Sequence, residues 1–213
     1  MSLLDEQVNV PELREALRQL PGPYLIRRYE ATLADYEQIS DEDLKCEYVD
    51  GELIVHSPAS IAHERLVTFI STLINLLASS RNLGEVYGSN AVMQLGRRRF
   101  SPDVSFLTLG HKQRVRAGQV RGPMDLAVEV LSASTRRYDL EEKRPAYRAG
   151  RVPEVWLIDP QRKVFEADVL AGGRYTSRRL TRGRFRSRVL PGFALDVTWL
   201  WSDPLPNPLD CLR

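Results

Sequence analysis

The sequence predicts an α/β fold, and three features support this class. The apolar run 124–132 predicts a buried strand, 139–150 a helix and 154–159 a further strand, which is the order that joins parallel strands of one sheet. The dipeptide Asp50-Gly51 predicts a tight hairpin, because both residues suit positive backbone angles. Apolar residues at helical spacing over 60–80 predict the longest helix.

The 213 residues suit one main domain with short additions at its ends. Leucines at helical spacing over 11–20 predict a helix within an N-terminal helical appendage, residues 1–31. A short helix near 33–39 is expected to open the main domain, residues 32–201. The Pro-rich tail, residues 202–213, is expected to be irregular.

The first half of the main domain is expected to be rich in strands. The hairpin consists of strands 46–49 and 52–55, which flank the Asp50-Gly51 turn. After the long helix, two strands are predicted over 85–95 and 99–108, followed by a loop rich in Gly and Arg over 110–123.

The second half centres on the strand within 124–132, whose nearly continuous apolar character indicates a central position covered on both faces. Asp139 is predicted as the N-cap or first-turn acid of the helix that follows, and Gly150 as its end. The runs 163–169 and 174–180 predict a C-terminal β-hairpin.

Composition indicates a globular protein, since 43% of the residues are hydrophobic. No apolar stretch approaches the ~20 residues of a membrane span, and the acidic N-terminus lacks the pattern of a signal peptide. We therefore expect a cytoplasmic protein with no membrane partner and no organic cofactor. Cys46 and Cys211 are too few for a disulfide framework and do not form a metal-binding cluster.

Charge is divided unevenly along the chain, although the net charge is only +2. Residues 1–52 contain 13 acidic and 5 basic residues, and the remainder contains 15 acidic and 25 basic residues. Arginine suits phosphate contacts, so the basic segments are candidates for binding DNA. For 174–188 an equally strong reading is a solvated strand edge that uses charge against aggregation. The DNA-binding candidates are Arg97, Arg98, Arg99, Arg136 and Arg137.

Two acids on neighbouring predicted strands suggest a metal site. Glu129 interrupts an apolar strand, where an ionised carboxylate costs several kcal/mol, at order of magnitude, unless it is compensated. Asp103 stands at the start of another apolar run. Such oxygen ligands select Mg²⁺ or Mn²⁺, which would serve phosphodiester hydrolysis. In the next helix, Lys143 could orient the attacking water, and Tyr147, four residues on, lies on the same helical face.

Taken together, these motifs resemble those of the Uma-type restriction endonucleases, a family of the PD-(D/E)xK nuclease superfamily. The resemblance implies a restriction-endonuclease-like core with a central mixed sheet flanked by helices, a divalent metal and a DNA substrate. The motifs that carry it are Ser101-Pro102-Asp103-Val104, Val128-Glu129-Val130-Leu131-Ser132, Glu142-Lys143, the segment Val152–Asp159, and Glu47-Tyr48-Val49-Asp50-Gly51-Glu52-Leu53 near the hairpin.

The resemblance also implies roles for individual residues. Asp103 and Glu129 match the metal-binding acids of the superfamily, and the carbonyl of Val130 would be its usual backbone ligand. Glu47 matches an additional acid of this subgroup. The departure is Leu131, which stands where the superfamily has lysine.

Lys143 must therefore substitute for the missing lysine, as in relatives whose lysine has moved to the following helix. Pro145 complicates this assignment, because proline fits only the first helical turn without a kink. His63 and Tyr147 are additional candidates for the site.

Each candidate also has a structural reading. Asp103 could cap a turn, Glu129 could pair with a buried arginine, and Glu47 could be a solvated strand residue beside the hairpin. His63 could belong to a helix start, and Tyr147 could pack in the core with a polar tip.

Three functions follow from these readings. The leading hypothesis is a Mg²⁺-dependent endodeoxyribonuclease, for which a homodimer would supply two active sites. The second is a catalytically degenerate DNA-binding or regulatory relative. The third is a non-enzymatic interaction protein.

Overall fold

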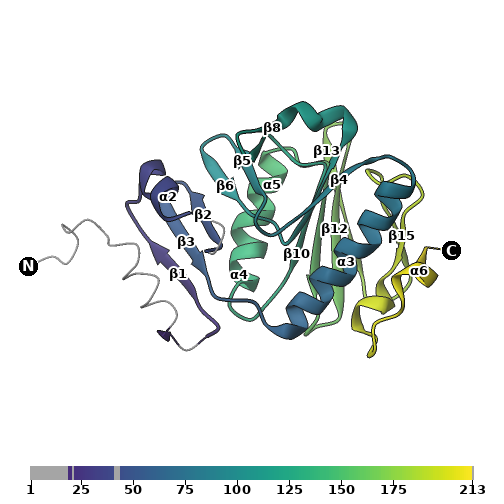
Figure 1. Cartoon of the computed structure of the whole chain (residues 1–213). Helices are drawn as coiled ribbons and strands as arrows, with labels where there is room; N and C mark the ends of the chain where they lie inside the picture. Colours follow the sequence, from purple (N-terminus) through teal and green to yellow (C-terminus); the bar gives the residue numbers. More distant parts are fainter. Residues whose placement is uncertain (1–18, 21, 41–43, 213) are drawn as a thin grey trace, which may run out of the picture.

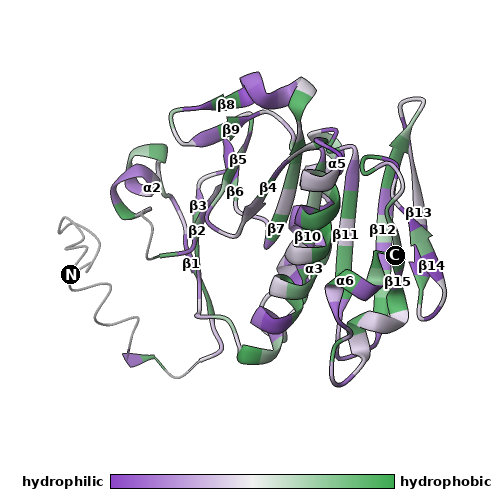
Figure 2. Cartoon of the chain, turned by 45° about the vertical axis from the view of Figure 1, so that its right-hand side comes forward, coloured by the Kyte–Doolittle hydropathy of each residue, from purple (hydrophilic) through white to green (hydrophobic). Residues whose placement is uncertain are grey.

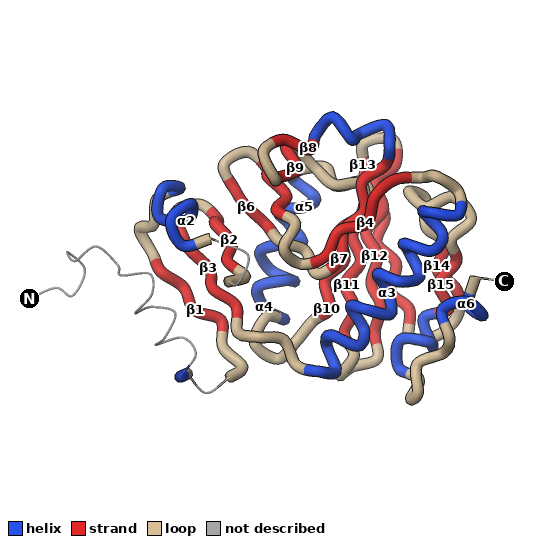
Figure 3. The backbone as a smooth tube through the Cα atoms, viewed as in Figure 1, coloured by secondary structure: helices blue, strands red, loops and turns tan. Residues whose placement is uncertain are grey.

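The computed structural model describes residues 19–20, 22–40 and 44–212, and these confirm the predicted α/β class. Two large sheets and a few helices form most of the molecule (Figures 1 and 3). The helix predicted over 11–20 lies outside the described residues, except for its last two positions.

The larger core is built on a six-stranded mixed sheet. Its strands are β4 (Gly84–Gly88), β7 (Val104–Thr108), β10 (Leu126–Val130), β11 (Glu154–Asp159), β12 (Val164–Ala171) and β13 (Arg174–Leu180), in the spatial order β13-β12-β11-β10-β7-β4. β10 and β11 pair in parallel, with Val128 beside Trp156, and the other neighbours are antiparallel. The predicted strand, helix, strand unit and the central place of the Glu129 strand are thus confirmed.

A second, seven-stranded sheet was not expected. Its strands are β1 (Leu25–Arg28), β2 (Cys46–Val49), β3 (Glu52–His56), β5 (Val92–Leu95), β6 (Arg98–Phe100), β8 (Val115–Arg116) and β9 (Gln119–Arg121), in the order β1-β3-β2-β6-β5-β9-β8. The predicted hairpin is confirmed here, since Val49 pairs with Glu52 and the turn residues Asp50 and Gly51 have φ angles of 51° and 93°.

The strands predicted over 85–95 and 99–108 are each broken in two, so their prediction as continuous strands was wrong. A turn closed by a hydrogen bond from the Ala91 N–H to the Gly88 carbonyl (3.0 Å) separates β4 from β5. Pro102, which has no N–H for a strand ladder, separates β6 from β7. The chain therefore crosses to the seven-stranded sheet and back, and the return places Asp103 just before β7.

Helix α3 (Ile61–Ser80) packs on one face of the six-stranded sheet, where Figure 2 shows hydrophobic segments along the helix and the strands beneath it. The Ser60 hydroxyl caps α3 by accepting from the His63 N–H at 3.2 Å. By length and hydropathy alone, α3 is the one helix in the described part of the chain that could cross a membrane, contrary to expectation. Its apolar stripe, including Phe69, Ile70 and Leu73, lies instead in the protein core.

The opposite face is covered by one continuous helical segment in three parts: α4 (Arg136–Tyr138), a π-helical turn (Asp139–Lys143) and α5 (Arg144–Ala149). Asp139 is not the N-cap, because the helix begins at Arg136, three residues earlier; it lies at the end of the first turn, the other predicted place. Gly150 ends it as predicted, with its N–H bonded to the Ala146 carbonyl. Pro145 lies after the π-helical turn, where the usual helical hydrogen-bond pattern is already interrupted, so the helix continues through it.

Helix α5 packs between the two sheets. Tyr147 meets Phe100 of the seven-stranded sheet edge-on, with ring centres 5.2 Å apart. In the same cluster of buried residues, Ala146 packs with Val155 and Leu157 of the six-stranded sheet. The helical segment that carries Lys143 thus has apolar contacts with both sheets.

A third apolar cluster attaches α2 (Leu33–Ile39) to the hairpin, through Tyr36 on the helix and Tyr48 on β2. The N-cap Thr32 and Asp35 form a reciprocal capping box. The expected helical appendage, residues 1–31, includes the strand β1, which pairs with β3. Residues 25–28 are therefore not helical.

The C-terminal hairpin is confirmed as β12 and β13, but it does not end the fold. Trp156 on β11 packs against Phe185 and Phe193, both with ring centres 5.7 Å away, and these bring the last segments onto the core. The expected irregular tail contains a short helix and packs partly against α3. The remaining elements are a 3₁₀ helix (Leu109–Arg114), β14 (Arg184–Arg186), β15 (Ala194–Asp196), a second 3₁₀ helix (Val197–Trp201) and α6 (Pro208–Cys211).

Two glycines of β4 provide a test of this packing. A Cβ atom at Gly84 would lie 2.1 Å from the Leu107 carbonyl oxygen, whereas one at Gly88 would meet nothing within 4 Å. We expect Gly84→Ala to lower the free energy of unfolding by about 1–3 kcal/mol. Gly88→Ala should change it by no more than about 0.5 kcal/mol. Urea unfolding followed by tryptophan fluorescence measures both, and equal effects would contradict the described pairing of β4 with β7.

Candidate active site

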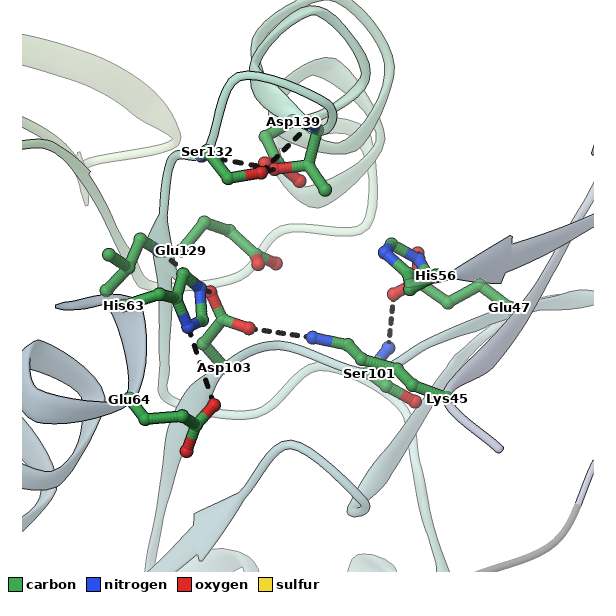
Figure 4. Close-up of polar contacts among 12 residues, drawn as sticks. Lys45, Glu47, His56, His63, Glu64, Ser101, Asp103, Glu129, Ser132 and Asp139 are labelled. Atoms are coloured by element: carbon green, nitrogen blue, oxygen red, sulfur yellow. Dashed lines mark hydrogen bonds and ion pairs between the residues drawn. The ribbon is translucent and has the colours of Figure 1, made fainter. Parts of the chain in front are cut away.

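Four acidic side chains from different parts of the chain come together beside the helical segment. Glu47 comes from β2, Asp103 from the position just before β7, Glu129 from β10 and Asp139 from the π-helical turn. All four are buried, with at most 5% of the residue exposed. Figure 4 shows that the carboxyl groups of Asp103 and Glu129 lie close together, with Glu47 across from them. The structure thus gathers the three acids that the sequence singled out and adds a fourth.

Lys143 lies at the centre of this group. Its Nζ is 2.6 Å from Glu129 Oε1, 3.2 Å from Glu47 Oε1 and 3.6 Å from Asp139 Oδ1. The Tyr147 hydroxyl donates to Glu129 Oε1 at 2.6 Å. The partners of Glu129 are therefore a lysine and a tyrosine, and its predicted alternative, a buried arginine partner, was wrong. Tyr147 is both a core residue and a member of the site.

Asp103 has three partners of its own. Lys45 Nζ lies 2.7 Å from Asp103 Oδ1, and His63 Nε2 lies 3.1 Å from Oδ2. The N–H of Val130 also donates to Oδ2, at 2.9 Å. Val130 is thus next to the predicted metal-binding acid, but the group that makes the contact is its N–H, and the role of its carbonyl stays a prediction.

Glu47 is held from both sides. Its Oε1 accepts from the Ser101 N–H at 2.6 Å, and its Oε2 lies 3.0 Å from His56 Nε2. Tyr138, at the end of α4, is buried in the same region, with its ring 5.7 Å from Lys143 Nζ. The carboxylate therefore links the hairpin to the strand connection that precedes Asp103.

Lys45 and His56 are two members of the site that the sequence analysis did not single out. The signal was present in the hairpin, because the Asp50-Gly51 turn fixes its register. Glu47 lies opposite Ile54 and the His56 N–H bonds to the Lys45 carbonyl, so the Lys45, Glu47 and His56 side chains share one face. Asp139 could have been found from its spacing, four residues before Lys143.

The charges in the site are unbalanced. Burial would raise the pKa of Asp103, but Lys45 and His63 outweigh this effect and hold that pKa well below its ordinary range. Glu47 behaves in the same way through Lys143 and His56. Burial, together with the neighbouring acids Asp103 and Asp139, raises the pKa of Glu129 to about 8 in spite of Lys143. Four carboxyl groups thus face two lysines and two histidines, so with neutral imidazoles negative charge is in excess, and a proton or a further cation can offset it.

The donor set fits a hard divalent cation in its chemistry, since the carboxylate oxygens are the ligands that Mg²⁺ and Mn²⁺ prefer. Within the described residues, however, no three His, Cys, Asp or Glu side chains are arranged to hold an ion as they stand. Lys45 and Lys143 occupy the positions next to Asp103 and Glu129. Binding of a dication there would require at least one ammonium group to withdraw.

The acids are closed off from solvent rather than lining an open cleft. Glu47 and Glu129 are 0% and 1% exposed, whereas the side chains of Lys45 and His63 are 22% and 14% exposed. The Lys45 and His63 side is therefore the side through which a ligand could approach Asp103.

The predicted DNA-binding arginines differ in their surroundings. Arg99 is buried and donates to backbone carbonyls, including that of Arg97 at 3.1 Å, so its guanidinium is not presented to a ligand. Arg97 is exposed, and Arg98 is bonded to Asp50 in the hairpin turn. Arg136 and Arg137 stand at the start of α4, paired with Asp159 and Glu141, respectively.

A central mixed sheet with helices on both faces, and acids at one end of its parallel strand pair, gives the chain a nuclease-like α/β fold. A similar fold occurs in the crystal structure of a putative nuclease of DUF820 from Anabaena variabilis, with a TM-score of 0.69 and 15% sequence identity. The match covers 80% of this chain and 97% of the other.

The sequence itself identifies the family. Residues 33–198 match the Uma2 family, which is described as putative restriction endonuclease, and the chain belongs to this family. The predicted resemblance is thereby confirmed. No curated protein matches the chain.

The raised pKa of Glu129 predicts how stability depends on pH without a divalent metal. Its pKa is about 8 in the folded protein and 4.5 ordinarily, so between these values the folded state binds more protons than the unfolded chain. The stabilisation is complete below pH 4.5 and is lost as the pH rises through 8.

We therefore expect wild-type stability in EDTA to fall between pH 5 and pH 9, and Glu129→Gln, which cannot titrate, to show a flatter profile. Urea unfolding at several pH values measures both proteins. Parallel profiles would show that Glu129 is not the titrating group.

Proposed function

We propose that this protein is a metal-dependent endodeoxyribonuclease that hydrolyses DNA phosphodiester bonds. The observation that carries the proposal is the convergence of Glu47, Asp103 and Glu129, from two sheets, with the ammonium group of Lys143. Acids that hold a cation and an adjacent lysine are the parts that phosphodiester hydrolysis requires. Membership of the Uma2 family supports the same reaction class.

Asp103 and Glu129, with Glu47, are the residues that would hold Mg²⁺ or Mn²⁺, and the Val130 carbonyl is a further candidate ligand. The metal would supply Lewis acidity to the scissile phosphate and acidity to its bound water. Lys143, 2.6 Å from Glu129, is positioned to orient the attacking water or to stabilise charge on the phosphate.

Secondary contacts hold these groups in place. Tyr147 orients the Glu129 carboxylate through its hydroxyl, and His56 and the Ser101 N–H fix Glu47. His63 and Lys45 do the same for Asp103. Because these two are the more exposed members, we infer that they move aside when a DNA phosphate enters.

A catalytically degenerate DNA-binding relative is the second candidate. Two observations favour it. Position 131, two residues after Glu129, holds a leucine that is buried with Leu157, so the strand supplies no lysine there. The acids are also closed off by ammonium groups. For the non-enzymatic interaction protein the evidence is divided: closed acids without a cleft at Glu129 are what it predicts, but Glu129 is paired with a lysine and a tyrosine and not with the arginine that it requires. A homodimer and a cytoplasmic location stay predictions.

Plasmid nicking tests the enzyme. With Mg²⁺ or Mn²⁺, we expect the wild-type protein to convert supercoiled plasmid to the nicked form and EDTA to stop it. Asp103→Asn and Glu129→Gln should each lower the rate by at least about 100-fold, as expected when a metal-dependent centre is lost.

The matched control is Asp125→Asn, a buried acid just before the same strand β10 that bonds to Thr108 and His111 rather than to the site. This variant should keep its activity if it folds, as checked by circular dichroism. A folded wild-type protein without metal-dependent nicking would favour the degenerate relative.

Metal binding can be tested separately from activity. We expect millimolar Mn²⁺ to raise the melting temperature of the wild-type protein, because binding to the folded state alone stabilises it. In Asp103→Asn the increase should be lost or strongly reduced, whereas Asp125→Asn should retain it. An equal increase in all three proteins would place the ion elsewhere.

A further inference from the structure

A small pocket lies beside the candidate active site, on the other flank of the helical segment. Its volume is about 20 Å³, enough for one oxygen-sized group and too little for a whole ligand. Its lining includes Leu131, which follows Val130 directly, and Leu140, which follows Asp139. Three arginines line it: Arg136, Arg162 and Arg179.

These three arginines approach the neighbouring acids in the same way. Arg136 Nε lies 2.9 Å from Asp159 Oδ2, Arg162 Nε 3.9 Å from the same oxygen, and Arg179 Nε 3.4 Å from Glu166 Oε1. In each case the carboxylate takes the Nε side of the guanidinium. No hydrogen bond joins the terminal nitrogens of these arginines to another residue of the described chain, so six donor groups remain for a ligand.

The charge of this region also favours an anion. Glu166 is shared with Arg144, whose Nη1 lies 2.7 Å from Oε2, and Asp159 is shared by Arg136 and Arg162. Residues 169–195, which include Arg179 of the pocket, contain six further arginines and no acid, and all of these arginines are exposed. The pocket therefore lies next to a surface with a strong excess of positive charge.

We propose that Arg136, Arg162 and Arg179 bind a phosphate of the DNA backbone near the one to be hydrolysed, with one phosphate oxygen in the pocket. This inference rests on the proposed function. Guanidinium groups suit the task, since they contact phosphate oxygens in pairs. Arg136 and Lys143 are seven residues apart on one helical segment, about 10 Å along its axis. A duplex strand, with a phosphate every 3.4 Å of its axis, can therefore reach both.

The competing explanation is that the arginines only protect the β13 edge from pairing with other chains. The register of β13 separates the two explanations. Arg179 lies opposite Glu166, on the side of the sheet that faces the helical segment, whereas Arg178 lies opposite Ala167, on the other side. If the arginines only protect the edge, Arg178 and Arg179 have equivalent roles. If a phosphate binds in the pocket, Arg179 contacts it and Arg178 does not.

The experiment compares Arg179→Gln and Arg162→Gln with the matched control Arg178→Gln, which removes the same charge from the neighbouring position. Binding to a fluorescent 20-base-pair duplex is measured by anisotropy in EDTA at several salt concentrations. We expect the first two variants to bind several-fold more weakly and to lower the salt slope by about 1, the value for one lost phosphate contact. Arg178→Gln should change both quantities much less.

An effect of Arg178→Gln as large as that of Arg179→Gln, or no effect in either pocket variant, would overturn the proposal. Competition with inorganic phosphate at constant ionic strength tests whether the anion in the pocket is free phosphate or a phosphate of DNA. If phosphate displaces no duplex from the wild-type protein, and the pocket variants bind the duplex normally, the pocket does not hold DNA. Because no cleavage occurs in EDTA, these results are independent of nicking. Weaker binding without nicking would refute the nuclease and retain the phosphate site.

Discussion

The buried ammonium group of Lys143 is the interaction on which the relation between the two sheets depends. It is 1% exposed and contacts Glu129 of the six-stranded sheet and Glu47 of the seven-stranded sheet. Apolar packing, such as Tyr147 against Phe100, also joins the sheets, but it tolerates small shifts. The contacts of two buried acids with one ammonium tolerate them less, because a shift would lengthen one of the contacts and weaken the compensation of that acid.

Such a centre contributes specificity more than net stability. Burying an ion pair costs nearly as much as the attraction returns, whereas breaking it leaves an isolated charge that costs several kcal/mol, at order of magnitude. Burial and the neighbouring acids raise the pKa of Glu129 in spite of Lys143, so this lysine does not fully offset its surroundings. The site is therefore poised to take up positive charge, which is the property expected of a centre that binds a cation for hydrolysis.

Local patterns in the sequence were sufficient for the elements that lie at the centre of the fold. The apolar run with Glu129, the helix that ends at Gly150 and the hairpin at Asp50-Gly51 all follow from short-range chemistry, and the structure contains them. The grouping of Asp103, Glu129 and Lys143 followed from motif context. The order of strands in space did not follow, because the turn at Ala91 and the break at Pro102 do not reveal that the chain changes sheets there.

The same limit explains the missed members of the site. The hairpin register puts Lys45 and His56 on the same face as Glu47, but they reach the other acids only because the β2–β3 hairpin belongs to a second sheet beside the helical segment, and no local pattern indicates that placement. The closed state of the site was equally hidden. An isolated acid in a strand indicates that a partner exists, but the partner proved to be the lysine itself rather than an arginine from elsewhere.

The π-helical turn at Asp139–Lys143 fixes the angular phase of everything after it. A residue advances an α-helix by about 100°, so one position more or fewer before Lys143 would point its side chain away from the strands. The widened turn thus sets the rotation of the helix separately from its length, and it lets a proline follow without ending the helix. A lysine on such a turn can take the place of a lysine that is missing from the strand, provided that the local winding of the helix is preserved as well as the amino acid.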